Sequence, residues 1–212
     1  LSLAMIPARA TAHSNIALVK YWGKRVDTDP DLNLPAVGSL SMTLDELRTV
    51  TLVAPADADR FTLDSEAIEG GPGVKVFAHL DRIWKAAGQA GPRPPCAVES
   101  TNHLPTAAGL ASSASGFCAL TLAAARAFEL DRDEAWLSAL SRQGSGSAAR
   151  SLWGGFVRLD AGVKTDGSDC IARPLLPADH WDLRLLVVHA VRGPKSIGST
   201  EGMERSRTTS PY

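Results

Sequence analysis

The stretch PTAAGLASSASG, residues 105–116, is built from small residues and leads into a helical pattern. Gly109 permits a close approach to the backbone, and Ala111, Ser112 and Ser113 place free amides and hydroxyls where the helix would begin. Amides at a helix start attract anions, so the stretch predicts a cradle for a di- or triphosphate. The same small residues also permit tight helix packing, and composition alone does not separate the two readings. The pattern has neither the lysine of a P-loop nor the glycine spacing of a Rossmann fold.

Apolar spacing predicts three helices around this stretch. One begins near Leu110 and continues to residue 130, and another covers residues 133–143. The third covers residues 74–90 and meets GPRPP, which is a typical stop signal. Its apolar positions recur at intervals of three and four, at Val76, Phe77, Leu80, Ile83 and Trp84.

Strands are predicted on both sides of these helices. RTVTLVA and RFTLDS, residues 48–54 and 60–65, alternate around an Asp-rich turn and predict a β-hairpin. Further strands are predicted at NIALV, GGFVRLD and LRLLVVHAV, residues 15–19, 154–160 and 183–191. GSLSMTL is typical of a capped strand. Hairpin, helices and later strands indicate an α+β class, and no linker divides the chain.

Composition excludes several classes of function. The 212 residues are 44% hydrophobic and 21% charged, which is typical of a globular protein that buries a core. A net charge of −1 gives no global attraction to nucleic acid or to an anionic membrane. The longest apolar runs are far shorter than the roughly 20 residues of a membrane span. No export signal is found at the start, which favours a cytoplasmic location.

Cysteine and histidine give no sign of a metal site. The cysteines are odd in number and widely spaced, so we expect reduced structural thiols at Cys96, Cys118 and Cys170. None of the five histidines shows metal-ligand spacing, and none is assigned to catalysis.

SNIALVKYWGKR, residues 14–25, is the first candidate binding segment. Asn15 and Tyr21 add polar groups, and Lys20, Lys24 and Arg25 add three positive charges within a short distance. These residues suit phosphate binding, although a solvated turn with its aromatics in the core would give the same pattern.

RQGSGSAARSLWGG, residues 142–155, is the second. Glycines separate the hydroxyls of Ser145 and Ser147, and Arg150 follows about one helical turn later. Arginine is the side chain best suited to a forked contact with a carboxylate. A helix cap followed by a loop remains the alternative for this segment.

Five segments together resemble the mevalonate diphosphate decarboxylases of the GHMP-kinase superfamily. They occur in the family order and cover the chain from about Ala12 onward. The segments are NIALVKYWGKR, LPAVGSLSMTL, PTAAGLASSASGF, GSGSAARSLWGGFV and GSTEGM. The resemblance implies the GHMP-kinase N-terminal fold, a mixed sheet packed with helices. It also implies ATP-dependent conversion of mevalonate diphosphate to isopentenyl diphosphate with Mg²⁺, in a homodimer.

The resemblance also implies roles for individual residues. Lys20 and Arg150 would be the catalytic basic residues, with Arg150 near the substrate carboxylate and Lys20 beside the reacting centre. Ser39 and Ser41 would lie near the same cleft. The residues expected to hold the substrate and its diphosphate are Asn15, Tyr21, Lys24, Ser145 and Ser147. Those expected to hold the nucleotide phosphates are Pro105, Ala108, Gly109, Leu110, Ala111, Ser112 and Ser113.

One part of the family pattern is not found in this sequence. The family supplies a catalytic aspartate from its C-terminal half, and we expect that group beyond Tyr212. We therefore expect residues 1–190 to form the ATP- and substrate-binding domain and residues 191–212 to begin an incomplete second domain. A kinase that phosphorylates mevalonate without decarboxylation and a truncated, non-catalytic nucleotide-binding remnant remain alternatives.

Overall fold

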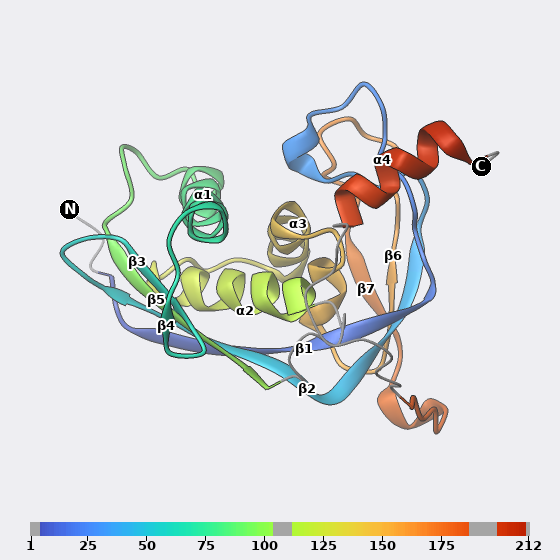
Figure 1. The fold of residues 1–212 in the computed structure, drawn as a ribbon, viewed down its shortest axis with the longest axis horizontal. Coiled ribbons are helices and arrows are strands. Elements are labelled where there is room, and N and C mark those ends of the chain that lie inside the picture. The colour runs from blue at the N-terminus through green and yellow to red at the C-terminus, as the bar shows by residue number, and fades with distance from the viewer. Residues whose placement is uncertain (1–4, 104–111, 187–198, 211–212) are drawn as a thin grey trace.

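The computed structural model describes residues 5–103, 112–186 and 199–210 (Figure 1). Within these ranges the strands form one seven-stranded mixed sheet, and helices α1, α2 and α3 cover one of its faces (Figure 1). The strands are β1 Ala8–Val19, β2 Ser39–Pro55, β3 Arg60–Leu63, β4 Glu66–Ala67, β5 Cys96–His103, β6 Phe156–Leu159 and β7 Ala172–Leu176. The helices are α1 Gly71–Ala86, α2 Ser112–Ala127, α3 Glu134–Gly144 and α4 Ser199–Thr209. Short 3-10 helices are η1 Pro30–Leu32, η2 Ala148–Leu152 and η3 Ala178–His180.

Strand β2 is the spine of the sheet. Its residues 48–55 pair antiparallel with β5, and its residues 39–42 pair antiparallel with β6. β1 pairs with β2 over both of these halves, so β5 and β6 share the other edge of β2. One long strand therefore carries two groups of neighbours, β5, β3 and β4 at one end and β6 and β7 at the other.

The predicted hairpin is wrong, although both of its strands exist. Residues 48–54 lie in β2 and residues 60–63 form β3, but β5 lies between them. β5 forms an eight-residue antiparallel ladder with β2, and β3 pairs with the far edge of β5 in parallel. A parallel pair needs a crossover connection, which α1 supplies between β3 and β5. A short Asp-rich turn between two strands favours their direct pairing. The sequence analysis did not predict a third strand, β5, that could lie between them.

The helices were predicted more accurately than the strand pairing. α3 was expected at residues 133–143 and is found at Glu134–Gly144, with the Asp133 carboxylate accepting from Trp136 N at 2.8 Å as an N-cap. α1 was expected at residues 74–90 but begins at Gly71 and ends at Ala86. It ends earlier because Gly88 adopts a positive φ of 77°, which an α-helix does not continue.

Small residues bring α2 close to the sheet. Its buried positions include a run of alanines with no exposed surface, Ala114, Ala119, Ala123 and Ala124. The main core lies between α2, α1 and the sheet, and includes Val53, Leu80, Ile83 and Val98. Because alanine has no bulk beyond Cβ, the start of α2 can sit directly on β1 and β2.

Other predictions have mixed outcomes. Residues 15–19 and 156–159 are strands as expected, and GSLSMTL opens β2. Of the strand expected at 183–191, residues 183–186 have no strand pairing and 187–191 lie outside the described residues. The three cysteines are free and buried, as expected. In the described ranges, no helix combines the length and apolar character needed to cross a bilayer.

Candidate active site

A bulge in the β1–β2 pairing, with its extra residues 44–47 on β2, lets two consecutive side chains of β1, Ser14 and Asn15, both face the helix layer. The β1–β2 register shifts between His13 and Asn15, and Ser14 and Asn15 are only 1% and 5% exposed. Neighbouring side chains of a regular strand face opposite sides, whereas a bulge allows both to face inward. Ser14 then bonds to α2, and Asn15 bonds to the η2 segment. The bulge therefore connects both segments that sequence analysis singled out.

Arg150 lies in η2 and is the buried cation of this region, 3% exposed. Its Nη1 donates to Ser39 Oγ at 2.8 Å, and its Nη2 donates to Asn15 Oδ1 at 3.4 Å. The Asn15 amide is itself fixed, because its Nδ2 donates to Ser147 O at 3.0 Å and to Ser151 Oγ at 2.8 Å. The guanidinium is thus hydrogen-bonded to one residue of β2 and one of β1. The β1 residue, Asn15, is itself fixed by the segment that carries Arg150.

No carboxylate neutralises Arg150 within the described ranges. It forms no ion pair there, and its Nε is buried without a hydrogen-bond partner. Burial lowers the pKa of Arg150, and the nearby Tyr21 partly offsets this. A buried charge without a counter-ion is unfavourable, and a bound anion would offset that cost. The arrangement is therefore suited to binding an anion.

Tyr21 covers Arg150, with the guanidinium carbon 6.0 Å from the ring centroid. Burial raises the pKa of Tyr21, and the charge of Arg150 acts in the opposite direction. Gly146 permits this arrangement, because a Cβ at that position would lie 2.9 Å from Tyr21 Cζ and closer still to its hydroxyl oxygen. The glycine between the two serines is therefore required by Tyr21.

A row of hydroxyls connects the start of α2 with this segment. Ser145 Oγ donates to Ser113 Oγ at 3.2 Å and lies 3.4 Å from Ser147 Oγ. Ser113 is exposed at the first turn of α2, where backbone amides have no partner within the helix. The structure thus brings the phosphate-loop serine and the Gly-Ser segment side by side.

The two lysines occupy different surroundings. Lys20 follows β1 as an exposed residue, and its Nζ lies 5.3 Å from the centroid of the Trp22 ring. Lys24 forms an isolated bridge with Pro35, and partial burial lowers its pKa. No contact joins either ammonium group to Arg150 among the described residues.

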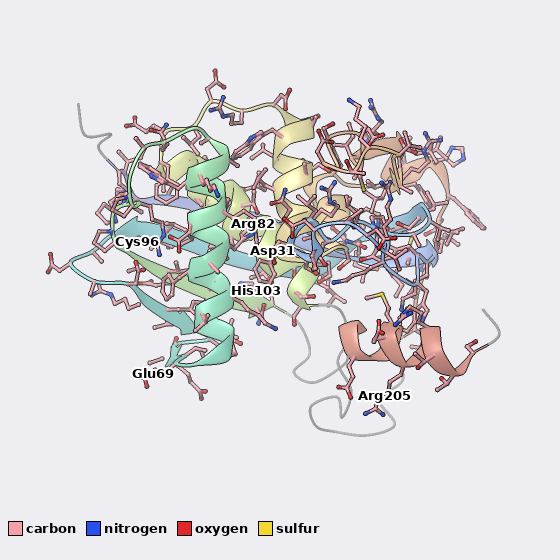
Figure 2. The ribbon with its side chains drawn as sticks, turned by 90° about the horizontal axis from the view of Figure 1, so that it is seen from above. Asp31, Glu69, Arg82, Cys96, His103 and Arg205 are labelled. Atoms are coloured by element: carbon pink, nitrogen blue, oxygen red, sulfur yellow. The ribbon has the colours of Figure 1, made fainter. Side chains whose placement is uncertain are left out.

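The segment that carries these lysines is fastened to the body of the fold at several points. Asp31 forms an ion pair with Arg82 of α1 at 3.3 Å, and Figure 2 shows the two side chains together. Asn33 Nδ2 donates to Gln143 O at 3.1 Å. Arg25 donates to backbone carbonyls of the loop after β6, namely Ala161, Gly162 and Lys164. These contacts fix the position of residues 20–35 relative to α1 and α3.

The predicted site residues fall into three groups. Those that the structure brings together are Asn15, Tyr21, Arg150, Ser113, Ser145 and Ser147. The side chains of Lys20, Lys24 and Ser112 are described, but they form no hydrogen bond or ion pair with that group in the described ranges. Outside the described residues lie Pro105, Ala108, Gly109, Leu110 and Ala111. Ser39 contacts Arg150, and the buried Ser41 Oγ has no partner in the described part of the chain.

Sequence analysis missed Ser151, which orients Asn15, and the buried hydroxyl of Thr49. Thr49 was not predicted to be buried because polar and apolar residues alternate along β2 in the reverse of the expected order. Thr49 and Thr51 face the helices, while Val50 and Leu52 are only partly buried, the reverse of the usual amphipathic pattern. Nor did the sequence indicate that the side chains of both Ser14 and Asn15 face the helix layer.

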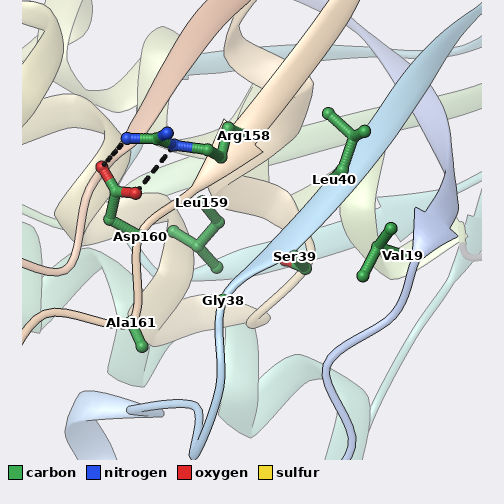
Figure 3. A pocket seen from close by; sticks show the side chains of 8 residues that line it. All are labelled: Val19, Gly38, Ser39, Leu40, Arg158, Leu159, Asp160 and Ala161. Atoms are coloured by element: carbon green, nitrogen blue, oxygen red, sulfur yellow. Dashed lines mark hydrogen bonds and ion pairs between the residues drawn. The ribbon is translucent and has the colours of Figure 1, made fainter.

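A shallow hollow of about 440 Å³ lies next to this region (Figure 3). Its walls come from the ends of β1, β2 and β6, and Arg158 there pairs with Asp160 at 2.8 Å. The hollow shares Ser39 with the Arg150 cluster but contains none of the predicted catalytic residues. Its arginine already has a carboxylate partner, unlike Arg150.

Comparison with known proteins identifies the family of the chain. Residues 12–172 match the family described as the diphosphomevalonate decarboxylase-like N-terminal domain. The chain belongs to this family. The match includes both β1 and η2, which supply the Arg150 cluster.

Relatives of the family support the assignment over nearly the whole chain. The diphosphomevalonate decarboxylase ERG19 of Gibberella zeae is 44% identical over 218 residues, covering 96% of this chain and 56% of that protein. Mevalonate diphosphate decarboxylase from Staphylococcus aureus superposes with a TM-score of 0.83 at 36% identity, covering 98% of this chain and 61% of that chain. A structure described as "MDDEF in complex with MVAPP, AMPPCP and Magnesium" gives a TM-score of 0.82 at 38% identity, over 98% and 62% of the two chains. The chain spans about half the length of the curated relatives it matches.

Proposed function

We propose that this chain provides the nucleotide- and substrate-binding part of an ATP-dependent diphosphomevalonate decarboxylase. The reaction converts mevalonate diphosphate to isopentenyl diphosphate and releases carbon dioxide, ADP and phosphate. The observation that carries the proposal is Arg150, a buried guanidinium with no carboxylate partner in the described residues, held by Ser39 and Asn15. A relative in this family has been solved with MVAPP, an ATP analogue and magnesium, which supports the same ligands here.

In this proposal Arg150 binds the substrate carboxylate. Two hydrogen bonds fix its guanidinium while Nε is left without a partner, so a fixed donor is available to an anion. An arginine fork favours a planar carboxylate over other anions. Orientation without very tight binding is what the reaction needs, because the carboxylate leaves as carbon dioxide.

The diphosphate and the nucleotide would occupy the hydroxyl-lined side of the cluster. Ser145, Ser147 and Tyr21 would hold the substrate diphosphate, with Lys24 adding positive charge. Ser112 and Ser113, with the free amides of α2, would hold the nucleotide phosphates. The same role for residues 105–111 stays a prediction.

Phosphorylation makes the chemistry possible. ATP supplies a phosphoryl group that turns the tertiary hydroxyl of the substrate into a leaving group, and the hydroxyl proton passes to a base, for which the resemblance implies an aspartate. When that group departs with its electron pair, positive charge develops on the tertiary carbon, and the electron pair from the breaking bond to the carboxylate forms the double bond. Fixed cations near the phosphates stabilise the charge that develops there, and we place Lys20 in that role.

Magnesium would enter with the nucleotide and be shared between its phosphate oxygens and nearby hydroxyls. Serine hydroxyls at the start of α2 suit such a hard cation. Among residues 5–103, 112–186 and 199–210, no group of three or more His, Cys, Asp or Glu side chains could hold a metal ion. The homodimer, the cytoplasmic location and the division at residue 190 also stay predictions.

The direct test incubates the full-length protein with MgATP and mevalonate diphosphate. We expect isopentenyl diphosphate and carbon dioxide in equal amounts. A stable phosphorylated product without carbon dioxide would favour the kinase alternative, and nucleotide binding without either product would favour the non-catalytic one.

Arg150→Ala tests the site itself. We expect turnover to fall at least a hundredfold while MgATP affinity stays within about twofold, because Arg150 is placed on the carboxylate rather than on the nucleotide. Arg158→Ala is the matched control, since Arg158 lies on the neighbouring strand, is exposed and is paired with Asp160. Equal activities for the two variants would remove Arg150 from the site.

A further inference from the structure

Four buried or partly buried polar side chains form a continuous hydrogen-bond chain beneath the first turn of α2. Ser14 Oγ donates to Ser115 Oγ at 3.1 Å, and Ser115 Oγ lies 2.8 Å from Thr49 Oγ1. Thr49 Oγ1 donates to Asn102 Oδ1 at 2.8 Å. The chain therefore runs from β1 through α2 and β2 to β5.

The direction of the hydrogen bonds is fixed by the number of protons. Thr49 has one hydroxyl proton, which Asn102 Oδ1 accepts, so Thr49 must accept from Ser115. Ser115 in turn accepts from Ser14, and its single hydroxyl proton is shared between Thr49 Oγ1 at 2.8 Å and Ser112 O of the preceding turn at 3.3 Å. Ser115 and Thr49 therefore each accept one hydrogen bond and donate another along the chain, and such linked bonds strengthen one another.

This location is unusual for polar side chains. Ser14 and Thr49 are 1% exposed and Ser115 is fully buried, in the same layer as the buried Ala12, Cys118 and Ala119. Alanine or valine would fill the same space without desolvating a hydroxyl. The hydrogen bonds of this chain therefore fix the orientation of the first turn of α2 on the sheet, which non-directional apolar packing alone would not do.

The chain also fastens both described ends of the phosphate stretch. Asn102 lies in β5, one residue before that strand ends, and its backbone N–H donates to Asp64 Oδ1 at 2.7 Å. Ser115 lies in the first turn of α2, close to Ser113 and Ser112. The entry strand and the exit helix are thus locked to each other through β2.

We propose that Ser14, Ser115, Thr49 and Asn102 are positioning residues for phosphate binding. They hold the first turn of α2 in the orientation in which its amides and the Ser113 hydroxyl receive the nucleotide. The inference rests on the proposed function for the identity of the ligand. The order that it predicts for the first turn of α2 does not depend on any ligand.

The chain offers a closely matched control for the test. Thr49 and Thr51 lie on the same face of β2, and each is paired with the β5 residue directly opposite, Asn102 or Ser100. Both threonines are buried, at 1% and 0% exposure. Only Thr49 is also hydrogen-bonded to α2 among the described residues. Valine has nearly the shape of threonine, so Thr49→Val and Thr51→Val each remove one buried hydroxyl and leave the packing in place.

Two measurements on the full-length protein separate positioning from general stability. MgATP titration should show about five- to tenfold weaker binding for Thr49→Val, which corresponds to the loss of one buried hydrogen bond, and less than a twofold change for Thr51→Val. Thr49→Ser should restore the parent affinity. Amide hydrogen exchange without nucleotide should be faster at Gly116 and Phe117 in Thr49→Val alone, because their N–H groups bond to first-turn carbonyls.

A double-variant cycle adds a third measurement. Thr49→Val combined with Ser115→Ala should bind MgATP no more weakly than either single variant, because both break the same chain. Equal exchange and equal affinity in Thr49→Val and Thr51→Val would overturn the inference and leave the proposed function intact. If the unsubstituted protein binds no MgATP, the proposed function is refuted instead. This measurement needs none of the variants, so the two failures are distinguishable.

Discussion

Replacing Gly146 with alanine should separate Tyr21 from Arg150 with little damage to the fold. A Cβ at position 146 would lie 2.9 Å from Tyr21 Cζ and closer to the hydroxyl oxygen. A comfortable carbon–carbon contact is about 3.5–4.0 Å and the hydroxyl oxygen lies closer than Cζ, so the ring must retreat by more than roughly 1 Å. Tyr21 is only partly buried, so it can move toward solvent.

The size of the effect follows from this movement. Overpacking typically costs about 1–3 kcal/mol, and we expect the lower end because the ring has room to rotate. Activity should suffer more, since a misplacement of about 1 Å in a site can reduce the rate about a hundredfold. Gly146→Ala should therefore lower kcat/KM for mevalonate diphosphate by about two orders of magnitude, with a loss of stability near 1 kcal/mol.

Steady-state kinetics and urea unfolding on the same preparations would check this. Gly154→Ala is the control, because a Cβ there meets nothing within 4 Å and the residue has no positive φ. A Gly146→Ala enzyme with kinetics like those of Gly154→Ala would refute the reasoning. A Gly146→Ala, Tyr21→Phe double variant should recover part of the loss, because the hydroxyl makes the closest clash.

Three further predictions concern His79, Cys118 and Asp59. Burial, assisted by Arg82, lowers the pKa of His79 to about 3, so between about pH 6.5 and 3 the unfolded state takes up a proton that the folded state does not. The free energy of unfolding should fall by up to about 1.4 kcal/mol per pH unit in that window, and His79→Gln should remove this slope in urea titrations at pH 6 and 5. Burial raises the pKa of the Cys118 thiol to about 12, so peptide mapping after iodoacetamide at pH 8 should find Cys118 unmodified in the native protein and modified after unfolding. Asp59→Asn, which weakens the contact of that carboxylate with the guanidinium of Arg93 at 2.5 and 2.8 Å, should lower the free energy of unfolding by about 1–3 kcal/mol, and an unchanged urea midpoint would contradict this.

The sequence predicted helices at α1, α2 and α3 but not at α4, and its motifs indicated several of the candidate site residues that the structure brings together. Periodicity gave α3 within one residue, and the Gly-Ser-Arg pattern located Arg150 and both serines. These signals are local, because the spacing of side chains along a helix or loop decides them.

Pairing was harder to predict because it is not local. β5 inserts between β2 and β3 through pairs of residues 37 to 55 positions apart along the chain, and the Asp-rich turn at 57–59 gave no sign of this. The inward turn of both Ser14 and Asn15 depends on a bulge that only the register with β2 reveals. Thr49 would be assigned to solvent by its polarity, yet it faces α2 because Ser115 and Asn102 satisfy its hydroxyl.

The two halves of β2 have a consequence for anyone who wishes to redesign this fold. β1 pairs with residues 40–43 and again with 48–53 of β2, while residues 44–47 are not paired in the β1–β2 ladder. A register error in one half therefore cannot travel along the ladder into the other. Substitutions around Ser39 can be screened for new substrates without re-optimising the seat of α2 around Thr49, so the two halves behave as separately adjustable modules on one continuous strand.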